Sequence, residues 1–512
     1  MLISLFLLLV HAVALANGFS SLVNSPVDGA INTVSGTQKS PSSDQDNETE
    51  ESKALLSILG GETGLSDFFD SVWQHQPALI RTSISTSATS ATLNNVHFDE
   101  EKMKLSPFEE LIGQGWTILT DLMEQPFRPN ENEPPLVIHN GLVQHPQEWM
   151  PAYSSTSLYA PYLNGSTVMQ AHADCLSPWL AAFCQDLQKT FPYVYTNTYI
   201  TPPHSRALNC HADDRDVLVV QLAGSKHWQV KKEVPIPFPY PHEQVGKADL
   251  EVPDYVEQGE DALTCTLQPG DVLYIPRGHC HQAQCTDELS FHVTIAVATF
   301  DWTLAGMIHQ ASKNILTNAL QHRKSILPLQ GLQHVPGNDD KTTTTKKQAL
   351  QTQIDQALDL LHQQITPDAV LNNLQARIDP HRERAHVGRE AQIQRGLVRL
   401  NSHRHNNNNN NNDNTKPSPA VIGMLASKQI NFDTKLRAAT DEERQQLPRV
   451  SKLQVREEMA QDVQSILAEL KANPASLSDI LSLRTSPAWC QLAWLGFAKQ
   501  AVEVGELALA EE

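Results

Sequence analysis

The chain has 512 residues, 38 of them basic and 58 acidic, which gives a formal net charge of −20. This length predicts about three domains, and an apolar fraction of 40% supports packed cores if part of the chain is unstructured. An acidic chain is a poor general nucleic-acid binder, and seven cysteines without a CxxC pair exclude a disulfide scaffold and argue against a zinc finger.

The N-terminus has the features of a secretory signal peptide over residues 1–16. A short apolar run at 2–10 is followed by the small residues of a cleavage site at 14–16. The alternative is an apolar N-terminus produced by a misassigned start. The run is too short to cross a bilayer and no other stretch reaches about 18 apolar residues, so no membrane span is expected. Residues 17–60 are rich in Ser, Thr, Asn, Asp and Gly, which predicts disorder.

The next part, residues 61–300, is predicted to be a single β-rich domain. Short β-type runs with turns between them predict a sandwich or barrel. These runs are residues 194–200, 217–222, 272–275 and 291–297. The Ala-Gly-Ser sequence at 223–225 predicts a turn, from which the chain returns over 226–230.

Two motifs within this domain carry metal-binding side chains. The first is His211-Ala212-Asp213, whose outer side chains share one side of an extended segment. The second runs from Gly270 through a turn to His279 and His281. Two histidines and one carboxylate leave three coordination positions open, which is the ligand set of non-haem Fe(II) oxygenases. We predict a metal site at His211, Asp213 and His281, with His279 as the alternative third ligand.

A second His-x-Asp sequence, His172-Ala173-Asp174, is a competing candidate. It precedes apolar residues at helical spacing, and no strand follows it. We interpret it as a helix entry with Asp174 near the N-cap.

The C-terminal part has a helical pattern interrupted by a low-complexity segment. Apolar residues at helical spacing over 304–319, 350–365 and 459–470 predict three helices. Thr366 followed by Pro367 predicts another helix start. Seven consecutive asparagines at 406–412 mark a linker. The predicted divisions are a helical region 301–400, an Asn-rich linker 401–419 and a C-terminal domain 420–512.

The motifs of residues 190–300 together resemble the ribosomal-oxygenase branch of the JmjC (cupin) family. The matching sequences are 197–203 (NTYITPP), 211–214 (HADD), 221–228 (QLAGSKHW) and 270–283 (GDVLYIPRGHCHQA). The resemblance implies an α+β fold, in which a double-stranded β-helix with flanking helices is followed by a helical dimerisation region and a winged-helix-like domain.

The resemblance also implies cofactors and their residues. It implies Fe(II) at the triad, with 2-oxoglutarate as cosubstrate and O2 as oxidant. Lys226 matches the lysine that pairs with the distal carboxylate of 2-oxoglutarate, where an exposed lysine at a hairpin turn is the alternative. Asn197, Tyr199 and His292 match other positions of the cosubstrate pocket. Ala296 stands where related proteins carry a serine, so Lys226 is expected to act alone or with Thr294 or Tyr199.

The implied activity is hydroxylation of a protein side chain, a ribosomal-protein His or Arg, with histone N-methyl-lysine demethylation as a related activity. The implied partners are a ribosomal protein or histone tail and a second copy of the chain. The alternatives are a non-catalytic cupin and a metal-cupin dioxygenase that does not use 2-oxoglutarate. The resemblance implies the nucleus or nucleolus, whereas residues 1–16 predict the secretory pathway.

Overall fold

A computed structural model of the chain describes most of the predicted domains. The described residues are 51–82, 105–124, 134–153, 157–247, 249–297, 302–323, 341–376, 378, 383, 386–388, 390, 430–431, 433–446, 453, 455–481 and 490–510. The signal-like segment 1–16 and the Asn-rich linker 401–419 lie outside these residues.

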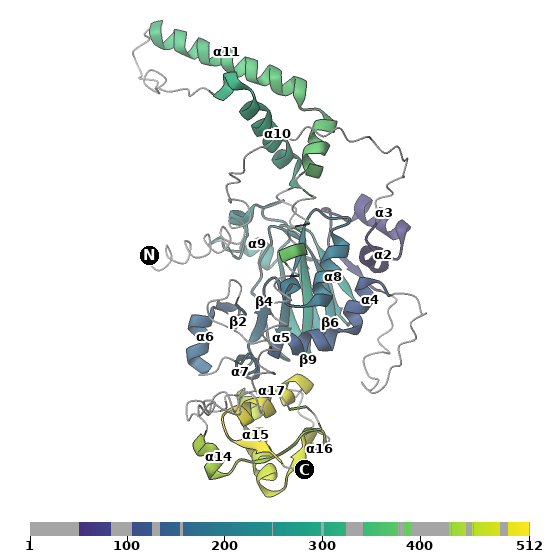
Figure 1. Cartoon of the computed structure of the whole chain (residues 1–512), viewed down its shortest axis with the longest axis vertical. Helices are drawn as coiled ribbons and strands as arrows, with labels where there is room; N and C mark the ends of the chain where they lie inside the picture. The colour runs from purple at the N-terminus through teal and green to yellow at the C-terminus, as the bar shows by residue number, and fades with distance from the viewer. Residues whose placement is uncertain are drawn as a thin grey trace, which may run out of the picture. The chain divides into compact units, whose positions relative to one another are not determined.

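The centre of the fold is a nine-stranded antiparallel sheet (Figure 1). Its order is β1-β8-β6-β9-β5-β4-β2-β3, and β7 pairs with β6 beside this path. The strands are β1 (Ala78–Ile80), β2 (Leu136–His139), β3 (Leu142–Gln144), β4 (Thr167–Gln170), β5 (Val194–Thr201), β6 (Asp216–Lys231), β7 (Asp261–Leu267), β8 (Val272–Ile275) and β9 (His281–Val297). The predicted strands at 194–200, 217–222, 272–275 and 291–297 all fall within β5, β6, β8 and β9.

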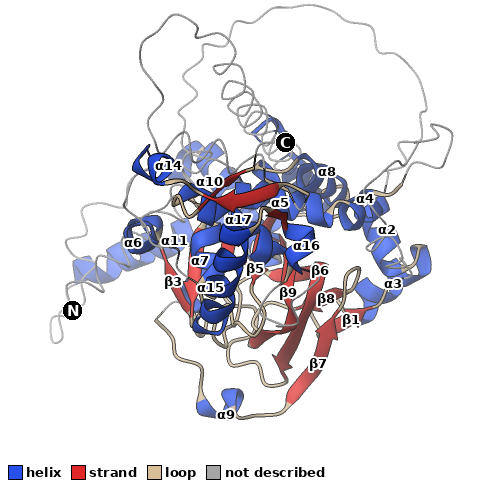
Figure 2. Ribbon diagram, turned by 90° about the horizontal axis from the view of Figure 1, so that it is seen from below, coloured by secondary structure: helices blue, strands red, loops and turns tan. Residues whose placement is uncertain are grey.

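The long strands β6 and β9 pair along their whole length, and Figure 2 shows them next to each other in the sheet. The prediction of a turn at 223–225 was therefore wrong, because β6 continues through these residues beside β9. The pairing shifts register around Gly224, which has a φ of +61°. A Cβ at Gly224 would lie 1.7 Å from the Leu289 carbonyl oxygen. The glycine thus marks a β-bulge, which bends a strand without reversing it.

Helices cover the sheet and form a continuous apolar core with it. They are α2 (Lys53–Leu59), α3 (Glu62–Ser71), α4 (Pro107–Gly113), α5 (Gly115–Glu124), α6 (Pro146–Tyr153), α7 (Tyr159–Leu163), α8 (Pro178–Leu187) and α9 (Asp254–Glu257). The prediction of disorder over residues 17–60 was wrong for the last part of this range, because α2 begins at Lys53. Asp186 accepts hydrogen bonds from Ser52 Oγ (2.8 Å) and Ala54 N (2.7 Å), so a distant residue fixes this helix start.

The region after the sheet contains α10 (Leu304–Asn318) and α11 (Lys341–Gln364), as the helical spacing predicts. The predicted N-cap is also confirmed, since Thr366 Oγ1 accepts from Ala369 N at 3.2 Å. Leu304 is 70% exposed and Leu358 57% exposed, so part of the apolar face of these helices is uncovered. No helix among the described residues is long and apolar enough to cross a membrane.

The C-terminal part has a small three-stranded sheet with helices around it. Its elements are β10 (Lys435–Ala438), α14 (Asp441–Gln446), α15 (Glu457–Ala472), β11 (Ala475–Ser476), α16 (Leu477–Leu481), α17 (Gln491–Glu503) and β12 (Leu507–Leu509). The sheet order is β11-β10-β12. Helix α15 buries the face predicted from the sequence, from Met459 to Leu470. Helix α17 packs on α7, and Lys499 Nζ lies 2.9 Å from Glu124 Oε1.

Candidate metal centre

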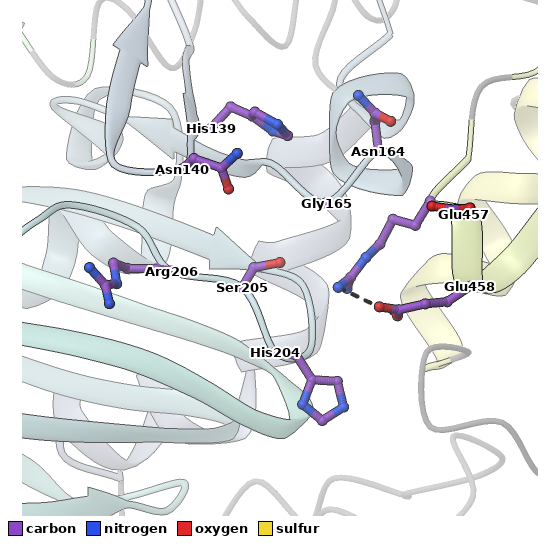
Figure 3. A pocket seen from close by; sticks show the side chains of 10 residues that line it. His139, Asn140, Asn164, Gly165, His204, Ser205, Arg206, Glu457 and Glu458 are labelled. Atoms are coloured by element: carbon purple, nitrogen blue, oxygen red, sulfur yellow. Dashed lines mark ion pairs between the residues drawn. The ribbon is translucent and has the colours of Figure 1, made fainter.

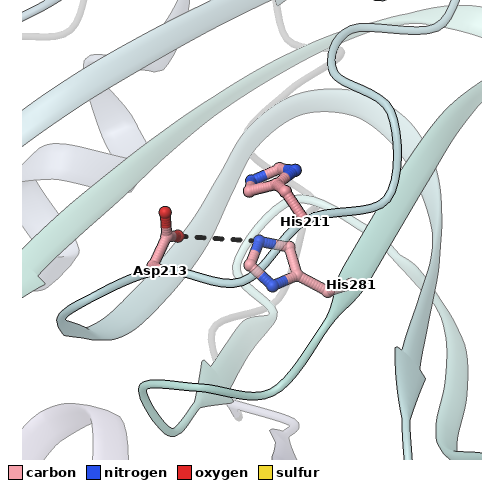
Figure 4. Close-up of side chains that lie close together, drawn as sticks. All are labelled: His211, Asp213 and His281. Carbon is pink, nitrogen blue, oxygen red and sulfur yellow. Dashed lines mark ion pairs between the residues drawn. The ribbon is translucent and has the colours of Figure 1, made fainter. Parts of the chain in front are cut away.

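The structure brings together the three side chains predicted to bind a metal (Figure 4). Each side chain offers one ligand atom, and the three atoms, from His211, Asp213 and His281, lie within 4.8 Å of one another. His211 and His281 are buried, and the side chain of Asp213 is 21% exposed. The site is therefore shielded on the protein side and reachable from one direction.

Backbone hydrogen bonds hold the two histidines in place. His211 N donates to His281 O at 3.1 Å, and His281 N donates to His211 O at 2.8 Å. Asp213 is fixed by its carbonyl oxygen, which accepts from Gly278 N at 2.9 Å. Gly278 has a φ of +92°, and a Cβ there would lie 2.7 Å from Ile236 O. The Pro-Arg-Gly turn therefore needs its glycine to bring the second motif against the first.

Both imidazoles present Nε2 to the site because their Nδ1 atoms are engaged elsewhere. Nδ1 of His211 donates to Asn209 O at 2.7 Å, and Nδ1 of His281 donates to His279 O at 3.0 Å. A carbonyl oxygen can only accept, so the proton is on Nδ1 and the Nε2 lone pair is free. Burial is the main cause that lowers the pKa of both histidines, so they are neutral, as metal ligands must be.

The carboxylate of Asp213 is ionised. Burial alone would raise its pKa, but Lys247 and the two imidazoles outweigh burial and hold the pKa well below the usual value. Lys247 Nζ pairs with Asp213 Oδ1, while Asp213 Oδ2 lies 3.6 Å from His281 Nε2. Lys247 was not predicted, because it lies in a long loop 34 positions from its partner.

The competing sequence motifs lie elsewhere. His279 directs Nδ1 to Lys231 O at 3.1 Å and is not part of the ligand cluster. The predicted helix entry is confirmed, because Asp174 lies in the first turn of a 3-10 helix (Ala173–Cys175) that directly precedes α8, although the N-cap of α8 itself is Ser177. Asp174 Oδ1 accepts from Thr196 N at 2.9 Å, so it supports β5.

A pocket of about 460 Å³, including its open mouth, adjoins the three ligands. Lys226 lines this pocket and is 1% exposed, so it is not the exposed hairpin lysine considered as an alternative. Its Nζ donates to Thr201 Oγ1 at 3.3 Å. No carboxylate of the described residues lies within ion-pair distance of Nζ. Burial lowers the pKa of Lys226 to about 8, and burial raises the pKa of the neighbouring Cys285 thiol to about 11.

The other predicted cosubstrate residues divide into two groups. Tyr199, His292 and Thr294 line the pocket, with the Tyr199 and His292 rings stacked 4.9 Å apart. Asn197 is not among the residues that line it, and its Oδ1 accepts from His172 N at 3.2 Å. Ala296, in β9, is 3% exposed and offers no hydroxyl.

Trp228 is a pocket residue to which the sequence motifs assigned no role. It follows Lys226 by two positions in β6, so both side chains lie on one face of the strand. Its ring centroid is 6.1 Å from that of His281 and 5.4 Å from that of His292. The alternation of the predicted segment 226–230 could have given this placement, because it contains both residues.

The donor set fits Fe(II). Two neutral imidazoles and one ionised carboxylate on one side of an ion leave positions open for exogenous ligands, as in non-haem iron oxygenases. The backbone carbonyls on both Nδ1 atoms are the outer contacts that orient histidine ligands.

A larger pocket of about 1070 Å³, including the open solvent at its mouth, lies between the sheet and the C-terminal part (Figure 3). His204, Ser205 and Arg206 line one side, and Glu457 and Glu458 at the start of α15 line another. Ala207 and Leu208, the next residues along the chain, line the pocket beside the metal ligands. Residues 204–208 therefore run from the polar cavity to the candidate metal centre.

This antiparallel fold and its His-Asp-His cluster are typical of the cupin class. Residues 154–304 match the JmjC domain family, so this part of the chain is a JmjC domain. The resemblance to the ribosomal-oxygenase branch is also confirmed by similar proteins.

Two curated relatives belong to that branch by name. The bifunctional lysine-specific demethylase and histidyl-hydroxylase NO66 of Drosophila willistoni is 25% identical over 361 residues, covering 70% of this chain and 42% of the relative. Ribosomal oxygenase 1 of Gallus gallus is 36% identical over 137 residues, covering 26% of this chain and 22% of the relative. The chain thus spans less than half the length of each.

A solved structure from the same branch is also similar. The ribosomal oxygenase YcfD of Escherichia coli aligns over 87% of this chain and 98% of its own, with 16% identity and a TM-score of 0.35.

Proposed function

We propose that the protein is an Fe(II)- and 2-oxoglutarate-dependent oxygenase that hydroxylates a protein side chain. One observation carries this proposal: the pocket beside the His-Asp-His cluster contains Lys226, a buried cation without a carboxylate partner among the described residues. Burying an unpaired charge is costly. A ligand that binds the metal at one end and offers a carboxylate at the other would offset this cost, and 2-oxoglutarate has both groups.

Each residue of the pocket has a defined part in this activity. His211, Asp213 and His281 would hold Fe(II), which supplies oxidative decarboxylation of the 2-oxo acid coupled to oxygen insertion into a C–H bond. Lys226 binds the distal carboxylate and so fixes the direction of the cosubstrate. The apolar wall formed by Val217, Val219 and Trp228 excludes water from the pocket.

The decisive experiment measures succinate formation from 2-oxoglutarate by the full chain with Fe(II) and ascorbate. We expect turnover in the wild type and none in His211→Ala. His279→Ala is the matched control, because His279 is a nearby histidine outside the cluster, and it should retain turnover. If the metal-loaded wild type does not bind 2-oxoglutarate, the proposal fails.

The proposed substrate is a histidine or arginine side chain of a ribosomal protein. The names of the two curated relatives support this class, and NO66 is also named as a lysine-specific demethylase. The cavity that adjoins segment 204–208 gives a polypeptide room beyond the residue that enters the pocket. Ribosomal-protein and histone peptides should be incubated with the enzyme and analysed by mass spectrometry. A gain of one oxygen indicates hydroxylation, whereas loss of a methyl group indicates histone demethylation.

Two other functions give different results in the same assay. A non-catalytic cupin would bind a ligand without forming succinate, with or without peptide. A metal-cupin dioxygenase of another type would consume O2 without 2-oxoglutarate. Lys226 favours the 2-oxoglutarate enzyme over the other dioxygenase, which leaves a buried cation beside the metal ligands unexplained. Succinate formation separates it from a cupin that only binds an anionic ligand.

The remaining parts of the proposal concern assembly and location. The exposed apolar residues of α10 and α11 support the homodimer, which sedimentation of the full chain would test. The small sheet with its helices at 430–510 supports a winged-helix-like domain. A ribosomal-protein substrate favours the nucleus or nucleolus. Microscopy of a C-terminally tagged chain, with sequencing of its N-terminus, would separate this location from the secretory pathway.

A further inference from the structure

The wall of the pocket contains two polar atoms that have no partner in the described part of the chain. They are Nε1 of Trp228 and Nδ1 of His292, and both belong to side chains at least nine-tenths buried. Buried indole N–H groups usually have a hydrogen-bond acceptor, because leaving the donor unpaired is unfavourable. Both residues line the pocket beside the metal ligands, which identifies that pocket as the place where the acceptor would lie.

Trp228 lies between the two ends of this pocket. Its ring centroid is 6.1 Å from the ring of His281 and 5.8 Å from Nζ of Lys226. The edge-on contact with His292, at 5.4 Å and 80°, fixes the orientation of the indole. A ligand that reached from the metal ligands to Lys226 would therefore pass the indole.

Around this pocket, the polar groups that lack some of their hydrogen-bond partners are mainly hydrogen-bond donors. Lys226 Nζ has three hydrogens, one of which is directed to Thr201, and the indole of Trp228 can only donate. One contact implied by the family resemblance is missing here, because Ala296 has no hydroxyl. An indole donor would replace it.

We infer that the Trp228 indole N–H donates a hydrogen bond to the bound 2-oxo dicarboxylate and is a second cosubstrate-binding residue beside Lys226. This inference rests on the proposed function, since it names a contact to the same cosubstrate. It is specific to the N–H group: a bicyclic ring of the same shape without the N–H would keep the packing and lose the contact.

The test uses the full chain loaded with Zn(II), which holds the site without turnover. The chain has eight tryptophans, so their ¹⁵N-labelled indole N–H signals can be followed individually by NMR. Trp228→Phe identifies the signal of residue 228. On addition of 2-oxoglutarate to the wild type, we expect this signal to move downfield as its hydrogen bond forms.

Binding of 2-oxoglutarate to the variants, measured by calorimetry, gives the second readout. Losing a hydrogen bond to a charged group should weaken binding about 10- to 100-fold in Trp228→Phe. Trp149→Phe is the matched control, because it removes the N–H of a fully buried tryptophan in α6 that does not line the pocket. It should bind 2-oxoglutarate like the wild type. Should Trp228→Phe lose Zn(II), a chain with 3-benzothienylalanine at position 228 keeps the bicyclic shape without the N–H.

The outcomes distinguish this inference from the proposed function. An unmoved indole signal and wild-type affinity in the residue 228 variants, with binding lost in Lys226→Met, would overturn the Trp228 contact alone. Absence of 2-oxoglutarate binding in the Zn(II)-loaded wild type would overturn both. A downfield shift with selective weakening in the residue 228 variants supports the contact.

Discussion

Replacing Lys226 by methionine should stabilise the protein when no cosubstrate is present. Burial lowers the pKa of this lysine from 10.5 to about 8. One pKa unit corresponds to about 1.4 kcal/mol, so keeping the charged form inside the protein costs about 3 kcal/mol at pH 7. Methionine has similar length and no charge, so Lys226→Met should raise the free energy of unfolding by up to about 3 kcal/mol.

The pH dependence of this gain follows from the sign of the pKa change. The folded state gives up the lysine proton at lower pH than the unfolded chain, so the cost to the wild type is complete below pH 8. It declines between pH 8 and 10.5, where the unfolded chain still binds the proton and the folded protein does not. The advantage of Lys226→Met should therefore shrink over this range.

Metal and 2-oxoglutarate should reverse the order of stability. The wild type gains stability from a ligand that binds only its folded state, whereas the variant lacks the cation that holds the distal carboxylate. The assay is urea unfolding followed by circular dichroism, with Mn(II) in all samples and with or without 2-oxoglutarate.

A second lysine of the same strand provides the control. Lys231 is 5% exposed, and its Nζ lies 2.9 Å from Asp261 Oδ1. Lys231→Met should destabilise the protein, because it leaves the carboxylate without its partner. Ligand-free Lys226→Met that is less stable than the wild type would refute the argument, since it would mean that the buried charge is already compensated within the protein.

Three further predictions concern the ligands, the cosubstrate and the bulge. His281→Ala should weaken Mn(II) binding, measured by electron paramagnetic resonance, by more than about 100-fold. His279→Ala should leave Mn(II) binding unchanged, because the backbone carbonyl that orients His281 is retained. Equal losses in the two variants would contradict the assignment of His281 as the ligand. Calorimetry should show 2-oxoglutarate affinity falling by up to about tenfold per pH unit above the Lys226 pKa of about 8, and a flat profile to pH 9.5 would exclude a charged lysine from binding. Gly224→Ala should lower the free energy of unfolding in urea by at least about 2 kcal/mol. The control Gly113→Ala, in a helix with open space around it, should leave this free energy unchanged or raise it slightly. A Gly224→Ala variant with the stability of the wild type would contradict the bulge.

Features with a local sequence pattern could be predicted well. The strand at 272–275 matches β8 because four apolar residues lie between a glycine turn and a proline. His211 and Asp213 share one side of an extended segment, so their proximity follows from strand geometry alone. Alternation cannot separate His281 from His279, because residues two positions apart share one side of a strand. The choice of His281 follows from the turn at Gly278, since β9 begins only at His281.

Features fixed by distant residues could not be predicted in this way. A glycine with positive φ suits both a turn and a bulge, and only the pairing of β9 with both halves of β6 decides between them at Gly224. The start of α2 depends on Asp186, more than 130 positions away. The salt bridge of Lys247 with Asp213 likewise has no signal in the local sequence.

The reciprocal hydrogen bonds between His211 and His281 make the metal centre a reporter of folding. The two imidazoles come from positions 211 and 281, and they become neighbours only when the strands between these positions have paired. A nascent chain therefore has no high-affinity site, and iron can load only after the sheet has closed. During refolding, the amount of bound metal would equal the number of molecules in which the sheet has formed. The rate of metal binding would therefore measure the slowest long-range step of folding.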